Sequence, residues 1–246
     1  MGLGRGLLKK LLHRLWLSRD PMTPADIVYG KLKLRLRPAD NAIESKLLFG
    51  SKVRDREEIR YLTEHLGPGS TFIDIGANMG YYALVVAGCG TNRVFAIEPN
   101  PIANERLLFN IRANEFEKSV TVLPVALGAV DGDVVLTIAA GDMGGSRIHT
   151  GAASDNKVKV PMMQLTQVLS EQSITSVDGI KIDVEGMEDH ILFPFFECAP
   201  RSLWPKFVII EHTSSRDWKR DILSFMLSSG YQAERKTRSN TMLRLI

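Results

Sequence analysis

A chain of 246 residues, with 44% hydrophobic and 24% charged residues, is long enough to bury a core and has the composition of an ordinary globular protein. This composition excludes wholesale disorder, and no apolar run reaches the length that a transmembrane helix needs. The formal net charge of +3 is weak and the basic residues are spread along the chain, so we expect no nucleic-acid partner.

The two cysteines indicate the redox state of the compartment in which the protein works. Cys89 and Cys198 stand far apart, and neither has a second cysteine or a metal-spaced histidine beside it. The pattern favours two core thiols in a reducing compartment. We therefore expect a cytoplasmic protein.

The first 19 residues predict a basic amphipathic helix. Leucine recurs there at helical spacing with lysine and arginine in between, but the segment lacks the unbroken apolar core and the cleavage site of a signal peptide. Such a helix packs on its own domain or on a partner, or it lies on an anionic membrane surface. Peripheral membrane contact through residues 1–19 and an oligomeric state therefore both stay open.

From residue 27 onward the hydrophobic pattern changes repeatedly between strand and helix. Residues 27–36 alternate apolar and basic side chains, as a hairpin or an edge strand does. We assign residues 1–49 to an N-terminal extension and residues 50–246 to one domain. In chain order we then expect a helix over 55–66, a strand over 71–75, a helix over 81–87, a strand over 93–97, a helix over 101–113 capped by Asn100, strands over 120–125 and 134–138, a helix over 165–170, a strand over 179–184, a helix over 187–196, a strand over 207–211, a helix over 218–228 and a closing strand pair over 231–246. This order predicts an α/β fold with a Rossmann-like, doubly wound, mostly parallel sheet and helices on both faces.

Ligands of such sheets bind outside the carboxyl ends of the strands, so the strand ends are where we look for a site. The first strand ends in a glycine-bearing turn in which Gly76 and Gly80 would let backbone approach a ligand closely. The turn lacks the second glycine of a dinucleotide fingerprint and carries the acidic Asp74, which a pyrophosphate would disfavour. S-adenosylmethionine has no phosphate and carries an ammonium group, so Asp74 favours this cofactor.

The second and third strand ends supply the rest of the expected cofactor site. Glu98 stands where Rossmann-like domains place an acid that accepts hydrogen bonds from a ribose diol. Ala126 follows the third strand and begins a run of small residues against which an adenine ring can lie.

Acidic residues also end the next two strands of the predicted sheet. Asp183 and Glu185 would point the same way if the fourth strand persists, and Glu211 with His212 ends the fifth strand. We expect these four residues to form the active-site cluster. Buried carboxylates need a partner, so a cofactor ammonium, a substrate hydroxyl, Lys181 or a metal should be within reach. No ligand spacing specific to a metal is present, and we expect no metal.

Taken together, these motifs resemble the FkbM-type methyltransferase family, a branch of the class I S-adenosylmethionine-dependent enzymes. The resemblance runs from about residue 50 to residue 212. It rests on the segments 72–82, 95–101, 180–188 and 210–211, together with Leu107, Asn110 and Asn114. It implies that Asn78, Tyr81, Pro99 and Asp183 also contact the cofactor. It further implies methyl transfer to oxygen on a small-molecule acceptor such as a sugar, a glycolipid or a polyketide-like product.

Transfer to a hydroxyl calls for a general base, for which Asp183 is our first candidate and His212 the second. The polar stretch from residue 144 to residue 159 is either an acceptor loop or a surface loop. An N-methyltransferase acting on a peptide or nucleotide, or a non-catalytic membrane-associated binding module, remains an alternative. The glycine turn disfavours an NAD-dependent oxidoreductase.

Overall fold

The computed structural model describes residues 14–15, 18, 23–50, 55–91, 93–138, 147–148 and 157–246, the pair 147–148 by its backbone alone. Most of the predicted N-terminal amphipathic helix and most of the predicted polar stretch over residues 144–159 lie outside these residues. Among the helices that the structure describes, none combines the length and the apolar character that crossing a bilayer requires.

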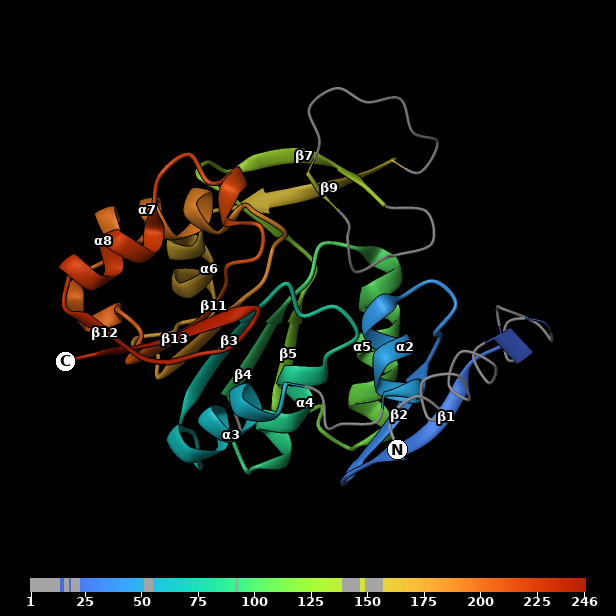
Figure 1. The fold of residues 1–246 in the computed structure, drawn as a ribbon. Helices are drawn as coiled ribbons and strands as arrows, with labels where there is room; N and C mark the ends of the chain where they lie inside the picture. The colour runs from blue at the N-terminus through green and yellow to red at the C-terminus, as the bar shows by residue number, and fades with distance from the viewer. Residues whose placement is uncertain are drawn as a thin grey trace.

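A seven-stranded sheet forms the centre of the molecule (Figure 1). Its strand order is β12-β13-β11-β10-β3-β4-β5, and β13 runs antiparallel to both of its neighbours while the other adjacent pairs are parallel. The predicted mostly parallel, doubly wound sheet is therefore confirmed. The strands are β3 (Thr71–Ile75), β4 (Arg93–Ile97), β5 (Val120–Leu123), β10 (Gly179–Ile182), β11 (Phe207–Glu211), β12 (Tyr231–Lys236) and β13 (Asn240–Leu245).

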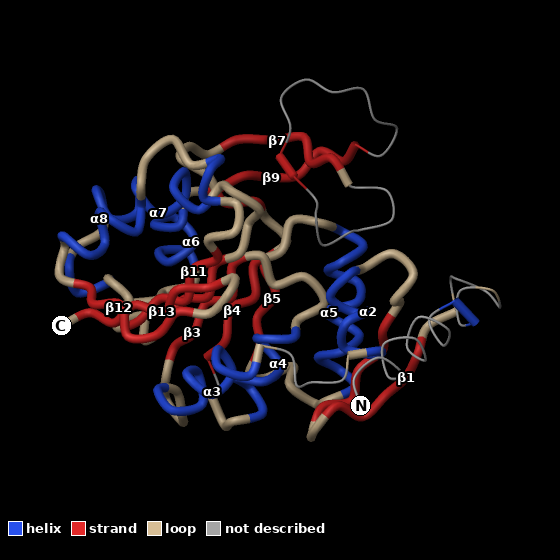
Figure 2. The backbone as a smooth tube through the Cα atoms, viewed as in Figure 1, coloured by secondary structure: helices blue, strands red, loops and turns tan. Residues whose placement is uncertain are grey.

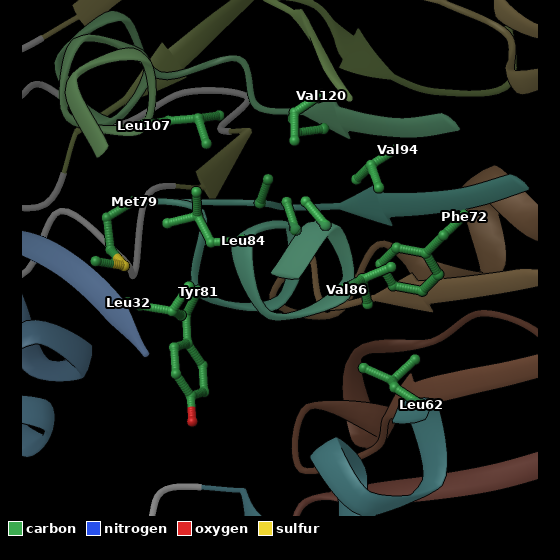
Figure 3. Close-up of a cluster of buried hydrophobic side chains, with 14 of the residues drawn as sticks. Leu32, Leu62, Phe72, Met79, Tyr81, Leu84, Val86, Val94, Leu107 and Val120 are labelled. Atoms are coloured by element: carbon green, nitrogen blue, oxygen red, sulfur yellow. The ribbon is translucent and has the colours of Figure 1, made fainter. Parts of the chain in front are cut away.

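Helices cover both faces of this sheet because successive residues of its buried strands point to opposite sides (Figure 2). Phe72 belongs to the core beneath one set of helices and Ile73 to the core beneath the other. The first core, part of which Figure 3 shows, lies under α3 (Arg56–His65), α4 (Tyr81–Gly88) and α5 (Pro101–Ala113). The second lies under α6 (Leu165–Glu171), α7 (Glu188–Cys198) and α8 (Ile222–Ser228).

The segment before the sheet packs onto the first core. The hairpin of β1 (Ala25–Tyr29) and β2 (Leu32–Leu36) buries Leu34 and Leu36 there, and the helix α2 (Ala42–Phe49) follows it. The backbone N–H of Arg35 donates to Asn110 Oδ1 of α5 at 2.8 Å. The predicted hairpin is thus confirmed, and it is continuous with the core of the sheet.

A second, four-stranded sheet lies over the carboxyl ends of β3, β4 and β5 (Figure 1). It holds a small core of its own around Leu136 and Val160. Its strands are β6 (Ala126–Leu127), β7 (Gly132–Thr137), β8 (Arg147–Ile148) and β9 (Lys157–Met163), and β9 pairs in parallel with β6 and antiparallel with β7.

The structure corrects several expectations about individual elements. The strand expected over 179–184 ends at Ile182, the helix expected from Trp218 begins at Ile222 after a 3₁₀ turn over Ser215–Asp217, and residues 157–159 lie in strand β9 instead of a loop. Helix α2 was not predicted. Cys89 and Cys198 are both exposed, so the prediction of two core thiols was wrong.

Candidate active site

The point where the strand order of the sheet reverses lies between β3 and β10, because the chain passes from β3 to β4 on one side and from β10 to β11 on the other. An open pocket of about 790 Å³, which we call the main pocket, lies at the carboxyl ends of these strands. Its walls are Ile43, Ile75, Gly76, Asn78, Ile97, Glu98, Pro99, Val125, Ala126, Leu127, Leu136, Asp183, Val184, Glu185, Met187 and Ile191.

Two further cavities adjoin the main pocket, and Ile43 and Asp183 line all three. The smaller one, the side cavity, lies beside the glycine turn and is lined by Asp74 and Tyr81 among others. The larger one, the outer cavity, is lined by Glu185 and Glu211 among others. Of the residues predicted from the sequence, the main pocket brings together Gly76, Asn78, Glu98, Pro99, Ala126, Asp183 and Glu185, whereas Gly80 and His212 line none of the three cavities.

The glycine turn after β3 depends on backbone conformations that favour glycine. Gly76 has a φ of 79°, and a Cβ built on it would lie 2.0 Å from the backbone oxygen of Asp183 in the neighbouring loop. Gly80 has a φ of 93°, and its Cβ would lie 2.3 Å from Leu107 Cδ1 of α5. Because neither glycine has a side chain, the turn packs closely against the Asp183 backbone and against Leu107 of α5. This packing brings the backbone of Asn78 to the edge of the main pocket.

Glu98 joins the two loops that bound the main pocket. One carboxylate oxygen accepts from the backbone N–H of Asn78 at 2.8 Å and the other from that of Asn100 at 2.9 Å. The residue is 7% exposed, and burial raises the pKa of its carboxyl to about 6 against the lowering effect of these two bonds. Since a carboxylate has about four lone-pair positions, each oxygen can still accept a hydrogen bond from a ligand in the pocket.

Asp74 is buried and lines the side cavity. Its Oδ2 accepts from the backbone N–H of Ala83 at 3.0 Å, in the first turn of α4. Its register partner on β10 is Lys181, which is 2% exposed and whose Nζ lies 3.3 Å from Asp183 Oδ2. Burial raises the pKa of Asp74 to about 7, and the positive charge of Lys181 opposes that rise. The chain thus provides its own ammonium beside Asp74.

The loop after β10 turns sharply instead of continuing as a strand. Glu185 has a φ of 55° and Gly186 a φ of 98°, so Asp183 and Glu185 are not related by strand alternation. Glu188, at the start of α7, holds this loop: its Oε1 accepts from the backbone N–H of Val184 at 2.9 Å. Its Oε2 accepts from Trp218 Nε1 at 2.7 Å, and burial raises the pKa of its carboxyl. Sequence reasoning missed this role of Glu188.

Glu211 and His212 at the end of β11 contact different parts of the molecule. Glu211 is buried, and its carboxylate accepts from the backbone N–H of Thr213 at 2.6 Å beside the outer cavity. His212 Nδ1 lies 3.1 Å from Thr241 Oγ1 on β13, and its backbone N–H donates to Ser239. Burial and then the charge of Lys236 lower the pKa of the imidazole. The structure therefore places these neighbours on different sides of the strand end.

Three carboxylates, those of Asp183, Glu188 and Glu211, have oxygens within 4.8 Å of one another. Asp183 is paired with Lys181, Glu211 accepts hydrogen bonds from the loop that follows it through both oxygens, and Glu188 accepts from Val184 and from Trp218. The expectation of no metal at this cluster stays a prediction.

Helix α2 supplies a wall of the site that the sequence analysis did not assign. Ile43 lies in its first turn, and Asn41 caps the helix while its Nδ2 donates to Asn78 Oδ1 at 2.9 Å. The pattern of Asn41 followed by Glu44 is that of a capping box, which could have revealed this helix. Two ion pairs hold this segment on α5: Arg106 contacts Glu44 at 2.8 Å and Asp40 at 2.7 Å.

Comparison with known proteins places the molecule in a family. Residues 74–233 match the family model described as the Methyltransferase FkbM domain, which covers more than half of the chain. This chain belongs to the FkbM methyltransferase family. The resemblance inferred from the strand-end motifs is thereby confirmed. Within the matched range lie the glycine turn, Glu98 and the loop after β10.

Two solved structures are similar to this FkbM methyltransferase. A putative rRNA-methylase from Clostridium thermocellum is 10% identical, with a TM-score of 0.50 over 78% of this chain and 94% of that one. The methyltransferase FkbM from Methylobacillus flagellatus KT is 17% identical, with a TM-score of 0.49 over 83% of this chain and 53% of that one. At 10% identity, the likeness to the Clostridium thermocellum structure shows the class I methyltransferase fold alone.

Among curated proteins, ribosomal protein L11 methyltransferase of Bacillus cereus (strain AH820) is 33% identical over 82 residues. The match covers 33% of this chain and 26% of that protein, so the chain spans about a quarter of the length of this relative.

Proposed function

We propose that this FkbM methyltransferase moves a methyl group from S-adenosylmethionine to a hydroxyl of a small molecule such as a sugar, a glycolipid or a polyketide-like product. The observation that carries the proposal is that two cavities of different polarity share part of their walls. The main pocket has the carboxylate of Glu98, which can accept from a diol, among mostly apolar walls, and it shares Asp183 and Glu185 with the polar outer cavity. A cofactor in the first would face an acceptor in the second.

The residues of the main pocket fit the chemistry of this cofactor. Glu98 has lone pairs left for a ribose diol, and Leu127 and Leu136 provide apolar contact for a planar base. None of the described residues that line the pocket is Lys, Arg or His, which disfavours a pyrophosphate and hence a dinucleotide. When bound, the cofactor supplies an electrophilic methyl group whose carbon–sulfur bond breaks with its electron pair left on sulfur.

Asp183 is our candidate for the base. Its side chain is 35% exposed, lines all three cavities and pairs with Lys181, which keeps a carboxylate at the junction of cofactor and acceptor. There it can take the proton of a hydroxyl as the oxygen is methylated. His212, the second candidate, faces Thr241 instead. Orientation by the cavity walls supplies the remaining catalytic effect.

Replacing Glu98 with alanine tests the cofactor assignment. Loss of the diol-accepting carboxylate and of the bonds to Asn78 and Asn100 should weaken binding of S-adenosylhomocysteine roughly 10-fold to 150-fold, since hydrogen bonds to a charged group are worth about 1.5–3 kcal/mol. Isothermal titration calorimetry measures the effect. Glu197→Ala, which removes an exposed carboxylate paired with Arg220, is the control and should bind like the unmodified chain. Unchanged affinity in Glu98→Ala, or tighter binding of NAD, contradicts the assignment.

The raised pKa of Glu98 predicts a pH dependence of that affinity. Hydroxyl donors of a ribose favour the ionised carboxylate, so the complex binds fewer protons than the free protein. The affinity for S-adenosylhomocysteine should therefore rise with pH up to about 6, which is the pKa of Glu98 in the free protein, and then level off. Titrations of S-adenosylhomocysteine at several pH values would show it. Asp74 also titrates near this pH, so the quantity to compare is the difference in affinity between the unmodified chain and Glu98→Gln at each pH. Parallel affinity profiles of the two proteins would contradict this role for Glu98.

The names of similar proteins raise other acceptors, a ribosomal protein or an rRNA. The outer cavity disfavours an RNA backbone, because four of its lining residues are acidic and one, Lys46, is basic. An N-methylated peptide or nucleotide remains the competing product. Contact of residues 1–19 with a membrane surface, a cytoplasmic location and the division at residue 49 stay predictions.

A further inference from the structure

Helix α2 forms a wall that the cofactor side and the acceptor side of the proposed site share. Its Ile43 lines the main pocket, the side cavity and the outer cavity, and Ala42 and Lys46 line the outer cavity as well. The helix lies beside α5 (Figure 1), and it precedes the residues 74–233 that match the family model. Its attachment to the cofactor side is therefore a feature that the family match does not cover.

Asn41, the residue just before α2, uses both ends of its side-chain amide. The residue is 1% exposed, and its Oδ1 accepts from the backbone N–H of Ile43 at 2.9 Å and from that of Glu44 at 3.2 Å. Because two N–H donors meet this oxygen, the direction of the amide is fixed and the nitrogen faces the other way. There Nδ2 donates to Asn78 Oδ1 at 2.9 Å. Asn41 thus caps α2 and also ties the helix to the glycine turn.

Asn78 is held through both its backbone and its side chain. Its φ of 51° lies in the left-handed region, which asparagine adopts more readily than most residues, and its N–H donates to Glu98 Oε2 at 2.8 Å. Its side-chain oxygen accepts from Asn41. A chain of hydrogen bonds therefore runs from Glu98, which we assign to the ribose diol, through Asn78 and Asn41 to the first turn of α2.

Resting on the proposed function, we propose that Asn41 is a positioning residue that couples the cofactor turn to the acceptor wall. A turn already held by Asn41 has less freedom to lose when the cofactor binds, so the bond to Asn78 pre-organises the site. Linkage requires the reverse effect as well, so a cofactor in the main pocket makes α2 harder to open. The acceptor then meets a wall of Ala42, Ile43 and Lys46 that the bound cofactor has ordered.

Asn41→Ser separates the tie from the cap. A serine hydroxyl also accepts from the first turn of a helix, so the cap is kept, but serine has no amide nitrogen to reach Asn78. We expect Asn41→Ser to bind S-adenosylhomocysteine roughly fivefold more weakly in calorimetry, which is the worth of one hydrogen bond between uncharged groups. Asp221→Ser exchanges the cap of α8 in the same way and, as the control, should bind like the unmodified chain.

A double-mutant cycle with Asn78→Gly shows whether Asn41 acts through Asn78. Glycine tolerates the left-handed backbone at this position and removes the side-chain oxygen. In the Asn78→Gly background, Asn41→Ser should cause no further loss of affinity, because the bond that it breaks is already gone. A structural role of Asn41 alone would give the same loss in both backgrounds. That result, or unchanged affinity in Asn41→Ser by itself, overturns the proposal.

Hydrogen–deuterium exchange of the amides of α2 measures the reverse effect on the acceptor wall. Saturating S-adenosylhomocysteine should slow this exchange in the unmodified full chain, and by roughly fivefold less in Asn41→Ser. Ile43 also faces the main pocket, so direct contact with the ligand leaves part of the slowing in both proteins. Asn78→Gly breaks the tie from the other side with the cap intact, so it should reduce the slowing too. Equal slowing in all three proteins refutes the coupling.

Binding to the unmodified chain decides separately on the proposed function. If the unmodified chain does not bind S-adenosylhomocysteine, the proposed function fails, whatever the variants do. If it binds this ligand and Asn41→Ser binds it as tightly, the proposed function stands and the coupling through Asn41 fails.

Discussion

Replacing Gly76 with alanine should lower the free energy of unfolding by about 2–5 kcal/mol. A left-handed backbone costs an alanine about 1–2 kcal/mol, and forcing extra atoms into a packed region costs a further 1–3 kcal/mol. The new Cβ would lie 2.0 Å from the backbone oxygen of Asp183, and backbone cannot move aside as a flexible side chain can. Either β3 or the loop after β10 must shift, so cofactor binding should be lost with the stability. Urea unfolding and calorimetry measure the two effects.

Gly30 provides the control for this substitution. It also has a left-handed backbone, with a φ of 63°, but no atom lies within 4 Å of the place where its Cβ would be. Gly30→Ala should therefore show the conformational cost alone, about 1–2 kcal/mol, and leave binding unchanged. If the two alanine variants lose the same stability, close approach of the glycine turn to Asp183 is not what the site requires.

The parts of the site that could be predicted from the sequence are those with a local signal. Buried strands appear as short apolar runs, and Glu98 and Asp183 are conspicuous because each is a charge directly after such a run. The glycines of the turn mark the same place. Since the carboxyl ends of parallel strands share one edge of the sheet, finding the strands was enough to gather these residues.

Other parts depend on contacts between distant segments and could not be predicted in this way. Val184 extends the apolar run of β10, so the sequence predicts a longer strand; in the structure its N–H donates to Glu188 and the chain turns at Glu185 and Gly186. Nothing local shows that Lys181 is the neighbour of Asp74 across β10, and contact of Asp74 with a cofactor ammonium stays a prediction. Ile43 reaches the pocket only because a helix in the predicted extension is held against α5.

The ion pair between Arg106 of α5 and Glu44 of α2 predicts a large loss of stability for Arg106→Met. Arg106 is 6% exposed and Glu44 is fully buried, so removing the guanidinium leaves a carboxylate without its partner. Breaking a buried pair in this way costs about 3–5 kcal/mol. Burial already raises the pKa of Glu44 against the lowering effect of Arg106, so the variant should raise it further. Unfolding in urea should then show a smaller loss at pH 5, where the carboxyl can take up a proton, than at pH 8.

Two further variants decide whether the ion pair itself is responsible. Arg60→Met removes an exposed arginine that pairs with Glu64 on the surface and should cost less than about 1 kcal/mol. Glu44→Gln in the Arg106→Met background removes the uncompensated charge but keeps an oxygen for the backbone N–H of Arg37, so part of the stability should return. No recovery, together with no pH dependence, would mean that lost packing of Arg106 causes the effect. Recovery that also restores binding of S-adenosylhomocysteine would show that the segment carrying Ile43 belongs to the working site.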